Sequence, residues 1–220
     1  MITLLEVDNV SVSFDGFKAV NNLSFTIGYN ELQAIIGPNG AGKTTFMDII
    51  TGQTKPDSGN ILWGEKSTNL IKKNETEIAL LGIGRKFQKP TVFENKSLIQ
   101  NLILSQKKNR NPFNVLFQRN SEYDIKNIIK ILKDINLLNI KDKRAGDISH
   151  GQKQWLEIGM LLTQNPKLLL VDEPAAGMTP NERNQTVQIL KKLSKSSSII
   201  VVEHDMEFVR NLNCRVTVLN

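Results

Sequence analysis

The segment Gly37–Thr45 reads GPNGAGKTT, which fits the pattern G-x-x-x-x-G-K-T. The preceding residues 31–36 end in an apolar run that predicts a buried parallel strand, and residues 46–50 place apolar side chains at helical spacing. A strand, a glycine-rich loop and a helix in this order form the context in which the pattern binds phosphate groups. The chain is therefore expected to fold as an α/β protein around a phosphate-binding loop.

The residue types of this loop indicate its chemistry. Glycines let backbone N–H groups point at an anion, and the following helix directs its positive end to the same place. Lys43 is expected to reach the β- and γ-phosphates of a nucleotide, and the Thr44 hydroxyl to ligate Mg²⁺. A glycine-rich turn with an accidental Lys-Thr pair is the alternative, which the complete match in this context disfavours. The residues predicted to hold the nucleotide are Gly37, Asn39, Gly40, Gly42, Lys43, Thr44 and Thr45.

The composition is that of an ordinary globular protein. The chain has 220 residues, of which 40% are hydrophobic and 23% charged, so it is long enough for one domain with a real core. The net charge of +6 comes from scattered lysines, which indicates solvated faces rather than a nucleic-acid surface. The single cysteine, Cys214, excludes an intrachain disulfide and suits a reducing compartment. With no signal-peptide core or membrane span, we expect a cytoplasmic protein that meets a membrane only through partners.

Two alternating segments, residues 4–13 and 23–27, precede the phosphate loop and predict a small antiparallel sheet. An aromatic side chain of this sheet is expected to stack on the adenine ring, because a ring stacks on a base without a specific hydrogen bond. Phe14 is the first choice and Phe17 the second. The alternative is that both are ordinary core residues.

The middle of the chain changes from strands to helices. Residues 60–63 predict a short strand, and residues 80–88 predict an apolar strand that ends at Gln88 before Pro90. From residue 91 to residue 146 the pattern is helical, with one helix over residues 97–104 and another opened by a capping box at Ser121. This segment is interpreted as a helical lobe inserted into the α/β core.

A further helix is predicted directly after Ser149, since this serine is a natural N-cap and apolar side chains follow at helical spacing. The free N–H groups of such a helix, together with the serine hydroxyl, would form a second anion-binding surface. A plain helix start is the alternative.

Two more apolar strands end in polar residues. Residues 168–171 are followed by Asp172 and Glu173, and residues 199–202 by Glu203 and His204. Open α/β sheets bind ligands at the carboxyl ends of their strands. Because side chains alternate along a strand, we expect Asp172 to hold Mg²⁺ and Glu173 to act as the general base for the attacking water. His204 is expected to bind the γ-phosphate.

Five motifs in this order resemble the ATP-binding subunit of an ABC transporter. They are the phosphate loop, Gln88, the Ser149-His150-Gly151-Gln152 helix, the Asp172-Glu173 strand and His204. The resemblance implies an α/β fold: a P-loop NTPase core with a parallel sheet, an N-terminal antiparallel β-subdomain and an inserted α-helical subdomain. It implies one domain over residues 1–220, with the core in 1–89 and 151–220 and the helical subdomain in 90–150.

The resemblance also implies an ATPase whose cofactors are ATP and Mg²⁺. Two subunits would pair head to tail, with each ATP held between the phosphate loop of one and Ser149, Gly151 and Gln152 of the other. Gln88 would contribute to catalysis and to the metal site.

The sequence around these motifs is similar to that of branched-chain amino acid and urea transporter ATPases. Residues 149–157 and 203–210 look most like the urea branch. The expected cargo is therefore urea or short amides, with branched-chain amino acids as the alternative. The resemblance implies as partners two membrane permease subunits, a second ATPase or another copy of this chain, and indirectly an external binding protein, at the cytoplasmic face of the membrane. No nucleic acid is expected, although a soluble ABC ATPase of DNA repair or translation is a competing interpretation, as is a regulatory module with a decayed ATPase.

Three features depart from the general pattern. His150 stands where the first signature glycine is usual, and Thr179 where most relatives have aspartate. The second departure places coupling between the paired sites through Thr179 in doubt. The chain also stops at Asn220 in an expected strand, where relatives usually continue.

Overall fold

The computed structural model describes residues 2–86, 91–106 and 122–220. The chain forms two compact units. The first consists of Met1–Phe87, Pro166–Ala176 and Leu190–Asn220, and the second of Gln88–Asn165 and Gly177–Ile189. Among the described residues, no helix has the length and apolarity needed to cross a membrane.

The first unit contains the predicted antiparallel sheet, in the order β2-β1-β4-β5. Its two long strands form a hairpin in which Phe14 pairs with Phe17. The turn between them, Asp15-Gly16, has positive φ at both residues, as a two-residue hairpin loop requires. The strands are β1 (Thr3–Phe14), β2 (Phe17–Gly28), β4 (Ser58–Trp63) and β5 (Thr68–Asn69).

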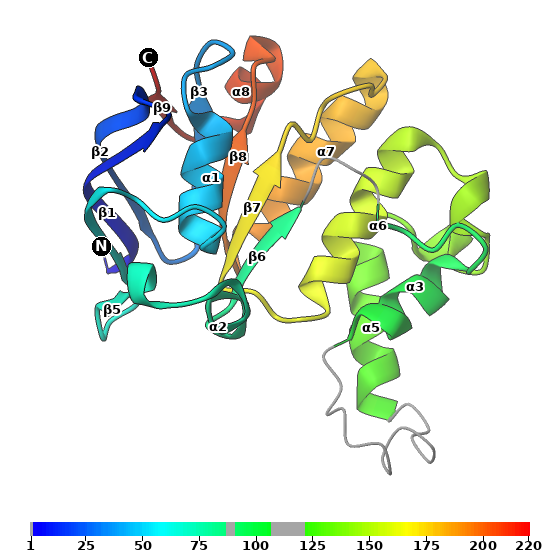
Figure 1. Cartoon of the computed structure of the whole chain (residues 1–220). Coiled ribbons are helices and arrows are strands. Elements are labelled where there is room, and N and C mark those ends of the chain that lie inside the picture. The colour runs from blue at the N-terminus through cyan, green and yellow to red at the C-terminus, as the bar shows by residue number, and fades with distance from the viewer. Residues whose placement is uncertain (1, 87–90, 107–121) are drawn as a thin grey trace. The chain divides into compact units, whose positions relative to one another are not determined.

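A parallel sheet in the order β6-β7-β8-β3-β9 forms the other layer of this unit (Figure 1). Every residue of β7 and β8 is buried, which explains why these strands read as continuous apolar runs. Since the strands are parallel, the segments that follow β3, β7 and β8 emerge at the same edge. The strands are β3 (Leu32–Ile36), β6 (Ile83–Lys86), β7 (Leu168–Asp172), β8 (Ser198–Val202) and β9 (Arg215–Val218).

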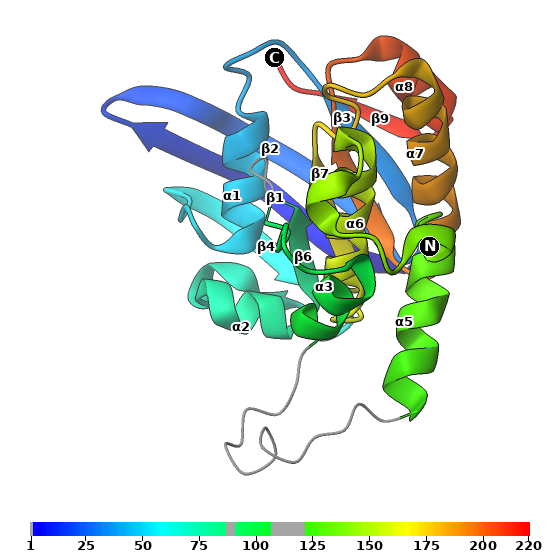
Figure 2. The same cartoon turned by 90° about the vertical axis from the view of Figure 1, so that its right-hand side faces the viewer.

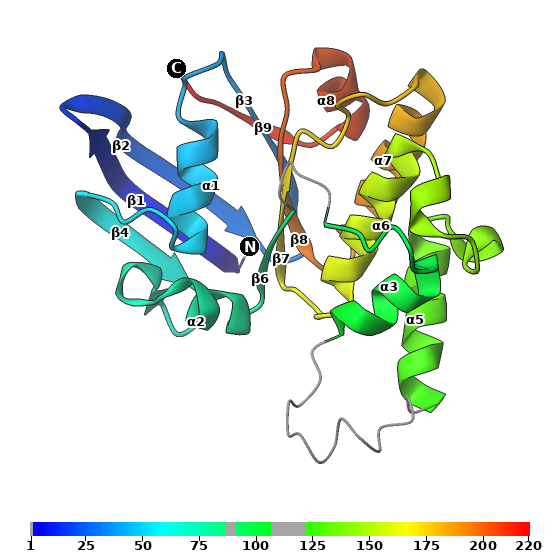
Figure 3. The same cartoon turned by 45° about the vertical axis from the view of Figure 1, so that its right-hand side comes forward.

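Helix α1 (Lys43–Thr51) stands between the two sheets (Figure 3) and fills the core of the first unit. Its apolar side chains, Phe46 among them, join one cluster with residues of both sheets. The Phe46 ring meets Phe25 of β2 edge to face, with ring centroids 5.1 Å apart. This packing fixes the helix that begins at the phosphate loop.

The predicted strand over residues 80–88 is wrong at its beginning. Leu80 ends helix α2 (Glu75–Leu80), and only β6 is extended. The helix forms because Asn74 and Glu77 make a reciprocal capping box, and Gly82, at φ 99°, turns the chain into β6. Gln88 lies outside the described residues. A short 3₁₀ helix (Leu70–Lys72) precedes α2.

The second unit is helical in its described residues, as predicted for the inserted lobe. Figure 2 shows α3, α5 and α6 side by side, and contacts join all three pairs. Ser97 caps α3 through a capping box with Gln100. The boundaries predicted for the helical subdomain, residues 90 and 150, stay a prediction. The helices of this unit are α3 (Leu98–Ser105), α5 (Glu122–Asp134), α6 (His150–Leu162) and two 3₁₀ turns (Leu138–Ile140 and Ala145–Asp147).

Two helices complete the chain. Helix α7 (Pro180–Leu193) begins in the second unit, and its last residues belong to the first. Helix α8 (Met206–Leu212) follows β8 in the first unit and is capped by the Asp205 side chain, which accepts a hydrogen bond from the N–H of Phe208 at 3.0 Å. This cap fixes the chain directly after His204.

Candidate functional site

The phosphate loop connects β3 to α1 as the sequence predicts. The N-cap of α1 is Gly42, which has φ 82°. Because it is a glycine, no side chain caps the helix. The first N–H groups of a helix have no acceptor inside the helix, so here they remain available to an anion. The Thr44 side chain is exposed in this first turn.

The tight fit of the loop against its neighbours requires glycine at Gly42. A Cβ atom there would lie 2.4 Å from the carbonyl oxygen of Ala19 in β2, which is far inside contact distance. The hairpin and the phosphate loop therefore approach each other through backbone atoms. A side chain at this position would force the loop away from the sheet.

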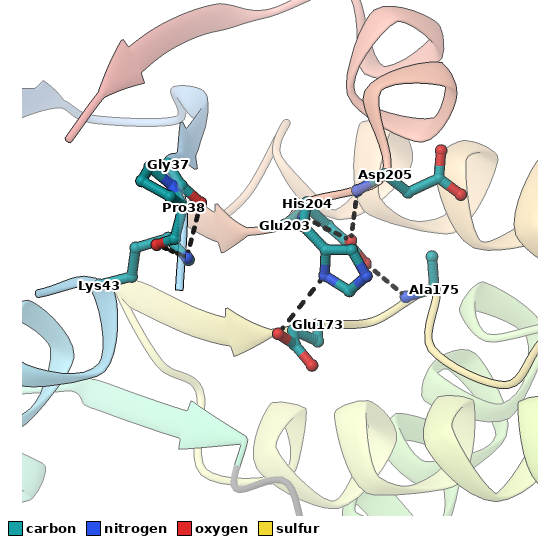
Figure 4. A network of polar contacts seen from close by, with 8 residues as sticks. All are labelled: Gly37, Pro38, Lys43, Glu173, Ala175, Glu203, His204 and Asp205. Carbon is teal, nitrogen blue, oxygen red and sulfur yellow. Dashed lines mark hydrogen bonds and ion pairs between the residues drawn. The ribbon is translucent and has the colours of Figure 1, made fainter. Parts of the chain in front are cut away.

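Lys43 is held inside the loop. Its Nζ donates hydrogen bonds to the carbonyl oxygens of Gly37 at 2.8 Å and Pro38 at 2.9 Å (Figure 4), and the residue is 8% exposed. The loop thus curls around the ammonium group, which adds a positive charge to that of the helix end. This arrangement can bind a phosphate chain.

The two predicted carboxylates end β7. Asp172 is buried, which raises the pKa of its carboxyl group, while the Arg85 guanidinium acts in the opposite direction. Glu173 follows with φ 45°, and its N–H donates to the carbonyl of Val202 at 2.9 Å. Its side chain is about one-third exposed, at 33%. The two carboxylates therefore have different surroundings, as expected for different roles.

His204 lies beside Glu173, so the structure brings these two predicted site residues together. The distance from His204 Nδ1 to Glu173 Oε1 is 3.5 Å, and the imidazole is 63% exposed (Figure 4). An exposed imidazole next to a carboxylate that is one-third exposed can meet a substrate from the solvent side.

Glu203, which belongs to none of the predicted motifs, is 1% exposed. Burial raises the pKa of its carboxyl group, and hydrogen bonds from backbone N–H groups, first that of Ala175, oppose this rise. A carboxylate directly after an apolar strand was visible in the sequence. Its contacts with a distant loop were not.

The Ser149 helix start also forms as predicted, within the second unit. Ser149 and Gln152 make a capping box, so Ser149 is the N-cap of α6. The Ser149 hydroxyl donates to Glu182 Oε1 at 2.5 Å, and a Cβ atom at Gly151 would lie 2.7 Å from the same carboxylate. The predicted anion-binding surface therefore carries an anion, the side chain of Glu182, which the sequence did not reveal.

Thr179 holds the other oxygen of this carboxylate. Its N–H and hydroxyl donate to Glu182 Oε2 at 3.0 and 2.8 Å. The pKa of Glu182 is lowered, first by the Ser149 hydroxyl and then by Thr179. The threonine that departs from the family pattern thus has a structural task at the start of α7.

The two candidate aromatic residues lie at the tip of the hairpin. Phe14 is 49% and Phe17 68% exposed, so the alternative that both are core residues is wrong. Exposed rings are free to stack on a base. Contact with adenine stays a prediction.

The residues present fit a magnesium nucleotide. The uncapped start of α1 and the Lys43 ammonium suit a phosphate chain. Thr44 and Asp172 offer the hard oxygen ligands that Mg²⁺ prefers. The third predicted ligand, Gln88, lies outside the described residues.

Known proteins resemble the whole chain. The family model described as ABC transporter matches residues 20–176. The high-affinity branched-chain amino acid transport ATP-binding protein LivG of Salmonella typhimurium is 32% identical over 226 residues, covering 99% of this chain and 88% of that protein. The probable branched-chain amino acid transport ATP-binding protein LivG of Methanocaldococcus jannaschii is 31% identical over 214 residues, covering 94% and 82%.

Solved structures of ATP-binding cassettes share the fold. The ADP conformation of MJ1267, an ATP-binding cassette of an ABC transporter, has a TM-score of 0.85 at 28% identity and covers all of this chain and 88% of its own. A nucleotide-free ATP-binding cassette has a TM-score of 0.82, also at 28% identity, covering 99% and 88%. The chain belongs to the ABC transporter family, in which it is an ATP-binding subunit with ATPase activity.

Proposed function

We propose that this chain powers import by a branched-chain amino acid ABC transporter, from the cytoplasmic face of the membrane. The observation that carries the ATPase part of the proposal is that the phosphate loop, Glu173 and His204 follow strands that end at one edge of the parallel sheet. A phosphate-binding group and a candidate base at the same edge suit hydrolysis of a nucleotide triphosphate.

In this proposal the phosphate chain of ATP lies on the N-terminus of α1. Lys43 exchanges its bonds to the loop carbonyls for bonds to the β- and γ-phosphates. The hydroxyl of Thr44, the carboxylate of Asp172 and the amide of Gln88 would hold Mg²⁺, which neutralises phosphate charge when bound. The remaining predicted phosphate contacts are Gly37, Asn39, Gly40, Gly42 and Thr45.

Glu173 acts as the general base. Its partly exposed carboxylate accepts a proton from the attacking water. The water oxygen forms a bond to the γ-phosphorus while the bond from this phosphorus to the β-phosphate oxygen breaks. His204 binds the γ-phosphate from the solvent side and orients this phosphate toward Glu173. ADP and inorganic phosphate are the products.

A second subunit completes each site. Ser149, Gly151 and Gln152 would bind the γ-phosphate held by the partner, as the family pattern implies. The N-cap geometry of Ser149 supports this role, because its hydroxyl already donates to an anion, the Glu182 carboxylate, which the γ-phosphate would have to displace. The partner is another copy of this chain or a homologous ATPase. Phe14 or Phe17 stacks on the adenine.

The cargo is inferred from relatives, because it would not touch this subunit. The two relatives described above are named for branched-chain amino acid transport, which supports that cargo over the urea expected from the motif sequences. The other proposed partners are two permease subunits and an external binding protein. No observation favours a nucleic-acid partner.

The test is ATP hydrolysis by the assembled transporter in liposomes, with its binding protein and either leucine or urea. Stimulation by leucine alone supports the proposal. Stimulation by urea alone would keep the ATPase and overturn the cargo. Stimulation by DNA or RNA would instead favour a nucleic-acid machine.

A further inference from the structure

The Glu203 carboxylate lies between two loops of the first unit and binds backbone atoms of both (Figure 4). Its Oε1 accepts the N–H of Ala175 at 2.7 Å. Its Oε2 accepts the N–H groups of His204 at 3.1 Å and Asp205 at 3.3 Å. One buried side chain therefore joins the loop after β7 to the loop after β8.

These two loops carry the proposed base and the proposed phosphate ligand. Ala175 follows Glu173 by two residues, and His204 adjoins Glu203. The Glu203 N–H also donates to the carbonyl of Ile35 at 3.1 Å, in the strand that leads into the phosphate loop. Glu203 thus connects all three segments at this edge of the sheet, through its side chain and its backbone.

The loop after β7 needs such support because of its backbone conformation. Glu173 has φ 45°, in the left-handed region that residues other than glycine rarely adopt. A strained residue keeps this conformation only where its surroundings hold it. Two backbone hydrogen bonds, Glu173 N–H to Val202 and Ala176 N–H to Glu173, hold the turn itself. Glu203 holds the segment that follows, at Ala175.

The chemistry of these contacts requires a carboxylate rather than an amide. All three neighbours are N–H donors, and an ionised carboxylate offers acceptors on both oxygens. Glutamine has the same shape, but it would turn an NH₂ group toward one set of donors. The amide could therefore satisfy one loop and not the other.

We propose that Glu203 is a positioning residue for ATP hydrolysis. By binding the backbone of both loops, it holds Glu173 and His204 in their relative positions. This inference rests on the proposed function. It assigns no contact between Glu203 and ATP.

The first test is hydrogen–deuterium exchange of the nucleotide-free full chain, comparing wild type with Glu203→Gln. Exchange at the Ala175 amide, or at the His204 and Asp205 amides, should become faster by about tenfold, since each of these amides loses its hydrogen bond to the carboxylate. Strands β7 and β8 should keep their protection. The matched control is Glu207→Gln, which removes the same charge from an exposed position on α8. Unchanged exchange in both loops would overturn the proposal.

If Glu203→Gln also loses protection in β7 and β8, Glu203→Asp replaces it. This variant keeps the charge and shortens the reach by one methylene. We then expect faster exchange at Ala175 with both strands protected. Full protection at Ala175 would overturn the role.

The second test is ATP turnover by the assembled transporter. Glu203→Gln should lower kcat by about 10- to 100-fold, as expected for one or two lost buried hydrogen bonds, while KM and the Kd for ATP change by less than about threefold. Unchanged kcat would overturn the proposal. Absence of turnover in the wild type would instead contradict the proposed function, and the exchange experiment distinguishes that case because it needs no hydrolysis.

Discussion

The Nδ1 atom of His204 lies 3.5 Å from Oε1 of Glu173, although the two residues follow different strands. Adjacent parallel strands, β7 and β8, bring them together, and Glu203 binds the loops of both. The phosphate loop leaves β3, the next strand of the same sheet. The positions of Lys43, Glu173 and His204 thus depend on three neighbouring strand ends.

Replacing Lys43 should remove nucleotide binding. Lys43→Ala loses the only side-chain charge of the loop, and we expect the affinity for ATP to fall by about 100-fold or more. Binding of a fluorescent ATP analogue measures this change. Lys55→Ala, at an exposed position, is the control, and normal affinity in Lys43→Ala would be incompatible with the phosphate-loop assignment.

Phe14→Ala should weaken ATP binding without destabilising the fold. The ring is 49% exposed, so its loss creates no core cavity, whereas a lost stacking contact costs about tenfold in affinity. Phe17→Ala should have the smaller effect. Phe93→Ala removes a ring of similar exposure, 52%, from the second unit and serves as the control. Equal affinities in all three variants would rule out stacking by the hairpin.

Thr179→Ala should lower the free energy of unfolding by about 1 kcal/mol, which is typical for the loss of an N-cap hydroxyl. The Thr179 hydroxyl accepts from the Glu182 N–H at 3.3 Å and donates to its carboxylate at 2.8 Å. Urea denaturation measures the change. Thr179→Ser keeps the hydroxyl and should stay close to wild type, so equal losses in both variants would argue against the cap.

Glu182 should contribute to the free energy of unfolding near neutral pH and lose this contribution in acid. Its pKa is lowered from an ordinary value of 4.5, first by the Ser149 hydroxyl and then by Thr179, so the ionised form favours the folded state. Its contribution is present above pH 4.5 and is lost as the pH falls through the lowered pKa. The stability difference between wild type and Glu182→Gln should therefore be constant near neutral pH and shrink below 4.5. A difference that grows on acidification would contradict this account.

The sequence predicted the parts of the fold that depend on continuous patterns. Strands β7 and β8 are buried on both faces, so they read as unbroken apolar runs. The strand predicted over residues 80–88 was wrong at its start because Leu80 and Leu81 are apolar in either conformation, and the capping box at Asn74 decides for a helix.

The candidate site likewise has a part that local motifs predict and a part that depends on contacts between residues distant in the chain. Lys43, Asp172 and Glu173 lie in local motifs, so the sequence alone was enough to name them as candidates. The contacts of Glu182 with Ser149 and of Glu203 with Ala175 join residues that are distant in the chain. No local pattern encodes which backbone N–H or hydroxyl a distant carboxylate will meet.

The most direct test of the central claim is ATP turnover by the assembled transporter carrying Glu173→Gln. An amide cannot accept the proton of the attacking water, so kcat should fall by about 10²- to 10⁴-fold while ATP binding is kept. Turnover near the wild-type rate would contradict the assignment of Glu173 as the general base. Loss of ATP binding in this variant would contradict it equally, because it would place Glu173 in nucleotide binding rather than in proton transfer.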